Sequence, residues 1–389
     1  MSAHAPDTRD RPAEAPSVVF RQVTKRYPGA DEPAVMELDL EVSGGEICVF
    51  VGPSGSGKTT AMRMVNRMVE ITEGDILVRG TSVRERSPAE LRREIGYVIQ
   101  QIGLFPHRTV ADNIATVPRL LGWKRQRIEA RVEEMLELVR IDPELRERFP
   151  AQLSGGQQQR VGVARALAAN PGVMLMDEPF GAVDPINRER LQNEFLRLQA
   201  EVRKTILFVT HDIDEAIKLG DQVAVLRVGG RLAQLADPAY LLAHPVDDFV
   251  ADFVGRDRGY RALSFQPTPR LPLRPERTLT LGESAVGADG DWALVVDHAN
   301  HPLGWVEPRR IDGEVTEQML HRGGTVAKAS GPLRAALDAA LSSPSRRGVI
   351  VDDSGALAGT VRAHEVLTAI EEADRPEVAD PLNPGAPAP

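Results

Sequence analysis

The feature that most constrains this chain is a glycine-rich segment, GPSGSGKTT, that follows a short apolar run. The segment spans residues 52–60 and fits the pattern G-x-x-x-x-G-K-[ST]. Residues 46–51 before it suit a buried strand, and residues 59–69 predict a helix. Glycines let successive backbone N–H groups turn toward phosphate oxygens, and a helix start adds positive potential. The sequence therefore predicts a strand–loop–helix unit that binds a nucleotide, rather than a Gly-rich turn that binds nothing.

The loop residues have separate expected roles. Lys58 is expected to reach the β and γ phosphates of ATP, and the Thr59 hydroxyl is expected to ligate Mg²⁺. The phosphate-binding residues expected from this pattern are Gly52, Pro53, Ser54, Gly55, Ser56, Gly57, Lys58, Thr59 and Thr60.

A second motif, LSGGQ, spans residues 153–157 and precedes a segment, residues 160–169, that predicts a helix. Ser154 and the amides of Gly155 and Gly156 would then lie at a helix start, which favours anions. Alone, the motif fits an ordinary helix cap equally well. Together with the phosphate loop it resembles the signature of the ATP-binding cassette (ABC) ATPases. The resemblance extends over about residues 17–255 and implies that Ser154, Gly155, Gly156 and Gln157 contact nucleotide.

Two adjacent carboxylates follow the next apolar run, residues 173–176. Alternation along a strand would direct Asp177 and Glu178 to opposite sides, so we expect them to act differently. Asp177 is expected to hold Mg²⁺, and Glu178 to polarise the attacking water. Pro179 and the apolar strand place the pair at the carboxyl edge of a sheet, where α/β proteins bind ligands.

The resemblance assigns further residues to the catalytic surroundings. Asp184 ends a GAVD segment similar to the D-loop of the family, with Val183 where leucine is usual. His211 follows the apolar residues 205–209 and corresponds to the switch histidine, which contacts the γ-phosphate and the attacking water.

Two other positions keep an alternative. Gln100 corresponds to the Q-loop glutamine, which senses Mg²⁺ and the γ-phosphate, but the neighbouring Gln101 leaves the register open by one residue. Tyr27 fits the aromatic residue that stacks on adenine, and an ordinary edge-strand tyrosine is the other interpretation.

The expected fold is α/β: a P-loop NTPase of the ABC type with a RecA-like core, an antiparallel β subdomain and a helical subdomain at about residues 101–165. The resemblance implies that two copies of the chain pair head to tail. Ser154 and Gly156 of one copy would face the γ-phosphate held by the other, so that nucleotide binding drives closure.

The composition of the chain limits the classes of partner and the compartment that we expect. No apolar run approaches the ~20 residues that span a bilayer, and residues 1–16 look disordered rather than like an export signal. The single cysteine, Cys48, favours a reducing compartment, and a formal charge of −9 disfavours nucleic acid as a partner. We expect a peripheral protein at the cytoplasmic face of the cell membrane. It would dock through residues 100–148 on a separate permease and, through the permease, serve a solute-binding protein.

The composition changes near Gly255. Residues 257–277 predict a linker, residues 278–373 contain two similar strand–Asp turn–strand blocks, and residues 374–389 are expected to be disordered. The repeat resembles a tandem CBS module with a degenerate first copy and a second copy at residues 325–373. Such modules often bind adenine nucleotides, so a regulatory nucleotide, a sensor of ionic strength and a purely structural pair all remain open.

A cassette ATPase with a C-terminal CBS pair resembles the motor subunits of osmoprotectant importers, which take up glycine betaine, carnitine or choline. The alternative is an importer of amino acids or another small solute. A soluble cassette protein of translation or DNA repair is disfavoured, because the chain has one phosphate loop and one signature.

Overall fold

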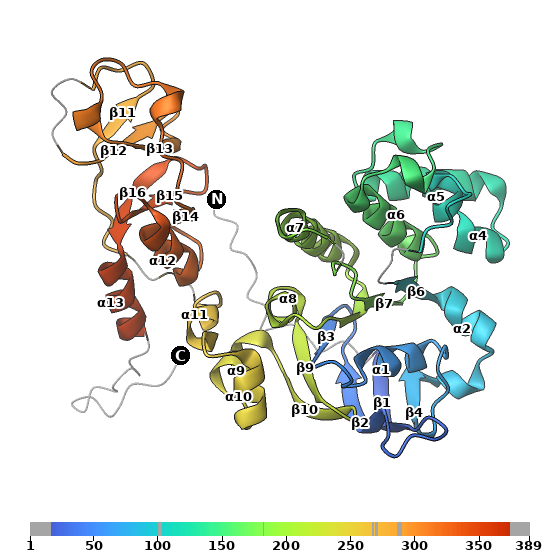
Figure 1. Ribbon diagram of the computed structural model, residues 1–389. Coiled ribbons are helices and arrows are strands. Elements are labelled where there is room, and N and C mark those ends of the chain that lie inside the picture. The colour runs from blue at the N-terminus through green and yellow to red at the C-terminus, as the bar shows by residue number, and fades with distance from the viewer. Residues whose placement is uncertain are drawn as a thin grey trace, which may run out of the picture. The chain divides into compact units, whose positions relative to one another are not determined.

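The computed structural model describes residues 17–99, 103–181, 183–266, 268, 271–285 and 290–373 (Figure 1). The chain forms two compact units that meet in sequence at Gly255 and Arg256. The expectations for residues 1–16, for Gln100 and Gln101, and for residues 374–389 lie outside the described residues.

The larger sheet of the first unit has the strand order β10-β9-β3-β8-β7-β6. The strands from β9 to β6 run parallel, and β10 is antiparallel to β9. Their bounds are β3 (Ile47–Val51), β6 (Ile95–Val98), β7 (Val173–Asp177), β8 (Thr205–Val209), β9 (Gln222–Arg227) and β10 (Arg231–Ala236). Every residue of β3, β7 and β8 is buried, as expected for central parallel strands covered on both faces.

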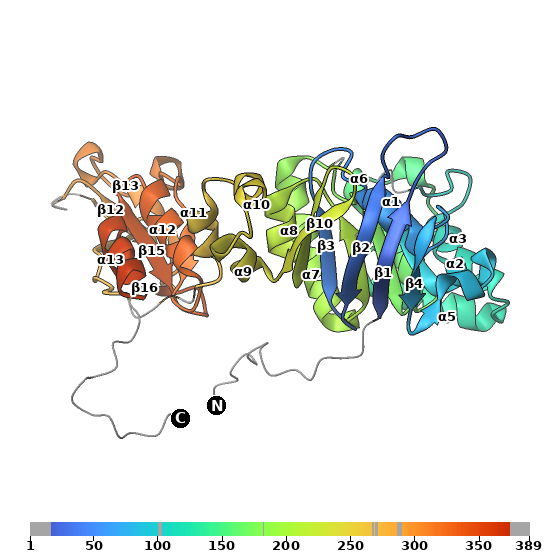
Figure 2. The ribbon, with the colours of Figure 1, turned by 90° about the horizontal axis from the view of Figure 1, so that it is seen from below.

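A second, antiparallel sheet has the order β2-β1-β4-β5. Its strands are β1 (Val18–Lys25), β2 (Val35–Val42), β4 (Glu73–Val78) and β5 (Thr81–Ser82). Helix α1 (Lys58–Val65) contributes Met62 and Met64 to a core that also contains residues from both sheets. Phe20 of β1 and Phe50 of β3 belong to this core, with ring centroids 5.9 Å apart. Apolar packing therefore holds α1 against both sheets, whose strands β3, β2, β1 and β4 are labelled in Figure 2.

The helical subdomain contains α3 (Val110–Ile114), α4 (Thr116–Leu120), α5 (Arg125–Leu138) and α6 (Gly155–Leu167). The chain bends at Ala115, which separates α3 from α4. The remaining helices of this unit are α2 (Pro88–Glu94), α7 (Pro185–Val202), α8 (Ile213–Leu219), α9 (Pro238–Ala243) and α10 (Asp248–Val254), with 3₁₀ turns at Val83–Glu85, Pro143–Leu145 and Pro150–Gln152. None of the helices in the described ranges is long and apolar enough to cross a bilayer.

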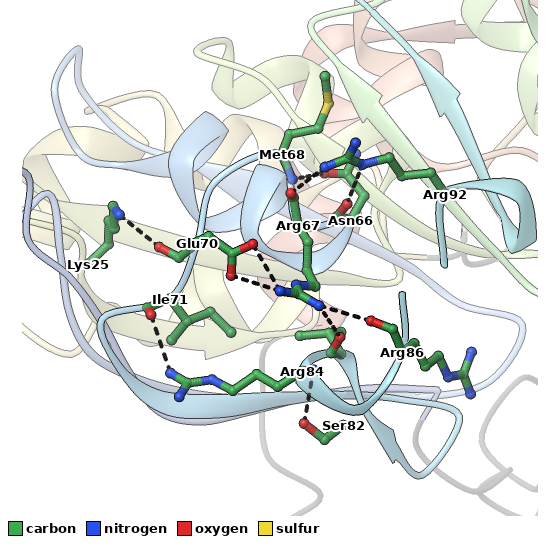
Figure 3. A network of polar contacts seen from close by, with 11 residues as sticks. Lys25, Asn66, Arg67, Met68, Glu70, Ile71, Ser82, Arg84, Arg86 and Arg92 are labelled. Carbon is green, nitrogen blue, oxygen red and sulfur yellow. Dashed lines mark hydrogen bonds and ion pairs between the residues drawn. The ribbon is translucent and has the colours of Figure 1, made fainter. Parts of the chain in front are cut away.

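A network of guanidinium groups at the end of α1 ties it to the 3₁₀ turn Val83–Glu85 and to α2 (Figure 3). Arg67 has a φ of 52°, which stops the helix four residues before the expected end at Val69. Its side chain donates to the carbonyl of Arg86 at 2.9 Å and pairs with Glu70 at 3.0 Å. Arg92 donates to the carbonyls of Asn66 and Arg67. Cations at these carbonyls satisfy backbone groups that the end of a helix leaves without partners.

The described residues of the second unit form two small sheets, β11-β12-β13 and β14-β15-β16. Each has a parallel pair followed by an antiparallel pair, with an irregularity at the same place, after Val295 in one and after Ile350 in the other. The bounds are β11 (Thr278–Thr280), β12 (Ala293–Val296), β13 (Pro302–Val306), β14 (Val326–Lys328), β15 (Arg347–Val351) and β16 (Leu357–Arg362). The internal repeat expected from the sequence is therefore present in the fold.

The two copies differ in their helices. The second copy has α12 (Leu333–Ser342) and α13 (Ala363–Ala373), whereas the described part of the first has only 3₁₀ turns at Pro308–Arg310 and Glu317–Met319. An apolar cluster joins the copies, with Leu294, Val296 and Trp305 from the first packed against Val349 and Val351 from the second.

Residues 257–277 were expected to be a linker, but their described part packs within the second unit. This segment contains α11 (Arg258–Ala262), and Leu263 belongs to the core formed by α12 and α13. Arg274 forms a β-bridge with Thr360 and pairs with Glu365 at 2.6 Å. The sequence of residues 257–277 has no helical or strand periodicity, so these contacts could not be predicted from it. Irregular segments are held by individual residue pairs rather than by a repeating pattern.

Candidate nucleotide site

The loop between β3 and α1 has a backbone that requires glycine at two positions. Gly57 has a φ of 77°, and a Cβ there would lie 2.2 Å from the carbonyl oxygen of Ala34. A Cβ on Gly52 would lie 2.3 Å from the carbonyl oxygen of Leu226. Side chains cannot be accommodated at such distances, so the glycines allow the tight curl that turns N–H groups inward. The predicted phosphate loop is therefore present as a strand–loop–helix unit.

Lys58 lies across this loop. Its Nζ donates to the carbonyls of Gly52 at 2.7 Å and Pro53 at 2.9 Å, and to Ser56 Oγ at 3.3 Å. Burial lowers the pKa of Lys58, and the nearby carboxylates of Glu178 and Asp177 oppose that shift. Phosphate oxygens are better partners for a buried ammonium than neutral carbonyls. The Lys58 ammonium is therefore placed to replace its hydrogen bonds to the loop carbonyls by bonds to phosphate oxygens when a nucleotide binds.

Thr59 and Asp177 come together although 118 residues separate them in sequence. Thr59 Oγ1 donates to Asp177 Oδ1 at 3.0 Å, and Asp177 is buried at the end of β7. A hydroxyl and a carboxylate are hard oxygen ligands of the kind that Mg²⁺ takes when nucleotide phosphates complete its shell. No group of three or more His, Cys, Asp or Glu residues within the described ranges could hold a metal alone. The chemistry of the donors therefore fits Mg²⁺ that arrives with a nucleotide.

Glu178 contacts a different neighbour from Asp177. Its Oε1 lies 3.2 Å from His211 Nδ1, and its backbone N–H donates to the carbonyl of Val209 at 2.9 Å. Glu178 has a φ of 43°, a left-handed conformation that costs a non-glycine residue of order 1 kcal/mol or more. Such strain is common where a side chain must be held in one orientation for function. The two adjacent acids thus have different hydrogen-bond partners, although Glu178 lies beyond the end of β7 and its left-handed backbone, rather than strand alternation, sets its direction.

The signature residues cap α6. Ser154 Oγ accepts from the N–H of Gln157, and Gln157 Oε1 accepts from the N–H of Ser154 at 2.8 Å, which is a capping box. Ser154 and Gly155 are exposed. They share an open groove with Asp184, which caps α7 by accepting from the N–H of Asn187 at 3.1 Å. The signature and the D-loop segment therefore form one surface.

Tyr27 lies beyond the end of β1 and is 41% exposed, so it is not an edge-strand residue. Lys25 Nζ approaches its ring to 4.9 Å from the centroid. An exposed aromatic face next to a cation can receive a purine base, which keeps the stacking role open.

Two residues at the site were missed from the sequence. Arg63 contacts Asp177 Oδ2 at 3.3 Å, and its place four residues after Thr59, on the same helical face, could have indicated this. Gln159 donates to the carbonyl of Pro179, directly after Glu178, and nothing in the sequence pattern marks that pair.

Comparisons with known proteins agree with this geometry. Residues 35–181 match the ABC transporter family. The osmoprotectant import ATP-binding protein OsmV of Salmonella typhimurium is 43% identical over 361 residues, which cover 88% of this chain and 94% of OsmV. The chain belongs to the ABC transporter ATP-binding proteins. This ABC protein is also 46% identical to the glycine betaine/carnitine/choline transport ATP-binding protein OpuCA of Bacillus subtilis, over 75% of this chain and 79% of OpuCA.

Solved ABC structures share the fold of the first unit. The dimeric bacterial cassette MJ0796 is 32% identical, with a TM-score of 0.50, over 57% of this chain and 98% of the cassette. The same scores hold for its post-hydrolysis state bound to ADP and Pi. The P-loop NTPase fold expected from the sequence is thus confirmed, and this ABC protein is an ATPase.

Proposed function

We propose that this ABC ATPase is the motor subunit of an osmoprotectant importer that takes up quaternary amines such as glycine betaine, carnitine or choline through a separate permease. The observation that carries this proposal is the length of the similarity to OsmV. It covers 361 residues, whereas the first unit ends at Gly255, so the similarity extends into the second unit. The alternative remains an importer of amino acids or another small solute.

The proposed chemistry follows from the site. The loop Gly52–Thr60 and Lys58 bind the phosphates, Tyr27 stacks on adenine, and Thr59, Asp177 and Gln100 hold Mg²⁺, which supplies positive charge at the phosphates when bound. Glu178 accepts a proton from the attacking water, and His211 lies within 3.2 Å to orient that carboxylate and the γ-phosphate. A partner copy contributes Ser154, Gly155, Gly156 and Gln157, together with Asp184 beside them. The exposure of Ser154, Gly155 and Asp184 in one chain supports a role for this surface at a head-to-tail dimer interface.

The test of this assignment is Glu178→Gln, which keeps the shape of the side chain and removes its basicity. We expect MgATP binding to persist, a stable ATP-bound dimer to form in light scattering, and turnover to fall by a factor of about 10² to 10⁴. Lys58→Ala should instead lose ATP binding. Normal turnover by Glu178→Gln would show that Glu178 is not the general base.

The solute requires a transport assay. The ABC protein, reconstituted in vesicles with its permease and solute-binding protein, should hydrolyse ATP faster when glycine betaine or choline is present. Stimulation by an amino acid but not by quaternary amines would favour the alternative.

A groove in the helical subdomain supports docking on a permease at the cytoplasmic face of the membrane. Thr109, Trp123 and Ile128 are among the residues that line it. Charged pairs in its lining, Asp112 with Arg119 and Arg125 with Glu129, offer polar contacts beside the apolar side chains. This is the composition of a surface that receives a short amphipathic helix. Crosslinks from a cysteine introduced at Trp123 should reach the permease in the assembled transporter.

We also propose that the second unit is a tandem CBS module that binds a regulatory adenine nucleotide. Its two sheets share strand order and pairing, and a groove beside them is lined by Trp292 and by Arg277, Arg346, Arg347 and Arg362. An indole for a base and guanidinium groups for phosphates suit a nucleotide. Calorimetry with ATP and AMP on the full chain carrying Lys58→Ala would report this groove alone. An absence of binding would leave a sensor of ionic strength or a structural module.

A further inference from the structure

The signature helix contacts the catalytic turn of its own chain through one buried side chain. Gln159 lies in α6, is 3% exposed, and donates from Nε2 to the carbonyl oxygen of Pro179 at 2.5 Å. Pro179 directly follows Glu178. The carboxylate assigned to water activation is therefore one residue from a group held by the helix that begins with the signature.

The orientation of the Gln159 amide is determined by its partner. A carbonyl can only accept, so the NH₂ group must face Pro179, and the amide oxygen must point elsewhere. Gln159 Oε1 is buried without a hydrogen-bond partner, and the side chain borders an apolar cavity with Met176, Phe180 and Phe195. A leucine or methionine would fill this place without leaving a polar atom unsatisfied. The bond to Pro179 is thus what a glutamine provides here.

The turn at Glu178 is held from its other side as well. Gly181 donates to the carbonyl of Glu178 at 3.1 Å, and the Phe180 ring packs on Phe195 and Phe208, each with centroids 6.0 Å away. Glu178 itself has the strained φ of 43°. A left-handed residue persists only where its surroundings determine it fully, and Gln159 is one of those determinants.

The signature and Gln159 are close on the same helix. Gly155 and Gln159 are four residues apart, so they lie on one face about 6 Å apart along the axis. A hydrogen-bonded helix transmits a shift at its start to its second turn. Anything that moves the exposed end at Ser154 and Gly155 therefore moves the donor that holds Pro179.

We propose that Gln159 is a positioning residue that couples the two nucleotide sites of the dimer. When the signature of one chain docks on the nucleotide of its partner, Gln159 sets the Glu178 turn of the docked chain for hydrolysis of its own nucleotide. This rests on the proposed function, because it takes the head-to-tail dimer as the active form and Glu178 as the base.

The test is Gln159→Leu in the full chain, with ATP hydrolysis measured over a range of ATP concentrations. Misplacement of a catalytic group without loss of binding should lower kcat by about ten- to a hundredfold and leave half-saturation by ATP nearly unchanged. The cooperativity of hydrolysis in ATP should fall toward independent sites. Thermal stability should not decrease, because the unsatisfied Oε1 is removed with the bond.

Gln159→Glu is the second variant, since it keeps the shape but opposes the Pro179 carbonyl with an acceptor. It should lose kcat and cooperativity as the leucine variant does. The matched control is Gln199→Leu in α7, because Gln199 is also buried and donates from Nε2 to backbone carbonyls, those of Gly45 and Lys204. This control should lose stability and keep kcat.

Three outcomes would overturn the proposal: an unchanged kcat in Gln159→Leu, a loss of kcat that only parallels a loss of thermal stability, and a loss of kcat with cooperativity intact. The failure of the proposed function is separate from these. It would appear as normal turnover in Glu178→Gln, whatever the result at Gln159.

Discussion

At the level of single residues, a buried carboxylate in α8, Glu215, affects the stability of the first unit. Glu215 in α8 is 6% exposed and accepts from Gln192 at 3.1 Å. Burial is the main cause that raises its pKa, and hydrogen bonds from Thr210 and Gln192 only partly offset it. The ionised form therefore opposes folding at neutral pH.

Glu215→Gln should consequently raise the stability of the first unit. The variant keeps an acceptor for Gln192 and removes the buried charge, so we expect a gain of about 1 kcal/mol, or roughly 2–4 °C in Tm, at pH 7. A carboxyl whose folded pKa is raised binds its proton more readily in the folded state. The difference between variant and wild type should therefore shrink as pH falls through that raised pKa and vanish below about 4.3. Thermal unfolding from pH 4 to 8 would measure it.

The exposed Glu189 provides the control for this comparison. Its side chain is 75% exposed and its contact with Lys218 is 3.8 Å long, so Glu189→Gln should change Tm little at any pH. A gap between Glu215→Gln and wild type that stays constant with pH would mean that the charge is not the cause.

At the scale of elements, Arg67 holds the end of α1. Arg67→Ala removes charge-assisted hydrogen bonds to the Arg86 carbonyl and to Glu70 (Figure 3), so stability should fall by about 2–3 kcal/mol. Denaturant unfolding would measure the loss, and Arg93→Ala, on the exposed face of α2, should cost less than about 0.5 kcal/mol. Equal effects of the two changes would rule out the network as a support of α1.

The helices and strands also show which parts of the fold could be predicted from the sequence. β3, β7 and β8 follow the predicted apolar runs within a residue, because central parallel strands are apolar throughout. Helix ends were predicted less evenly: Ser154 caps α6 as expected, but α6 ends at Leu167 rather than at residue 169. α1 stops before Arg67, whose φ depends on partners far along the chain. The pairs Arg63–Asp177 and Gln159–Pro179 join separate motifs, and no local pattern encodes such contacts.

At the scale of the whole molecule, the division between units decides where the chain can be cut. A protein ending at Gly255 should fold and hydrolyse ATP, because the first unit contains the phosphate loop, the signature and both carboxylates. A cut after Arg277 would leave Leu263, Leu271 and Leu273 without the second-unit core against which they pack. The shorter protein should therefore aggregate less than the longer one in light scattering.

Removal of the second unit should also change regulation. We expect the protein ending at Gly255 to keep basal ATP hydrolysis and to lose the dependence on salt or on a nucleotide effector that the full chain shows in the reconstituted transporter. ATPase rates at low and high salt would compare the two. An identical response would assign the second unit a structural role.

The apolar cluster between the two small sheets determines whether either half of the second unit can fold alone. Leu294, Val296 and Trp305 pack against the sister sheet, and the described part of their own copy has no α-helix to cover them. The half that has helices therefore shelters apolar residues of the half whose described part has only 3₁₀ turns. We therefore expect that neither half folds alone, and that residues 325–373 expressed by themselves are unfolded.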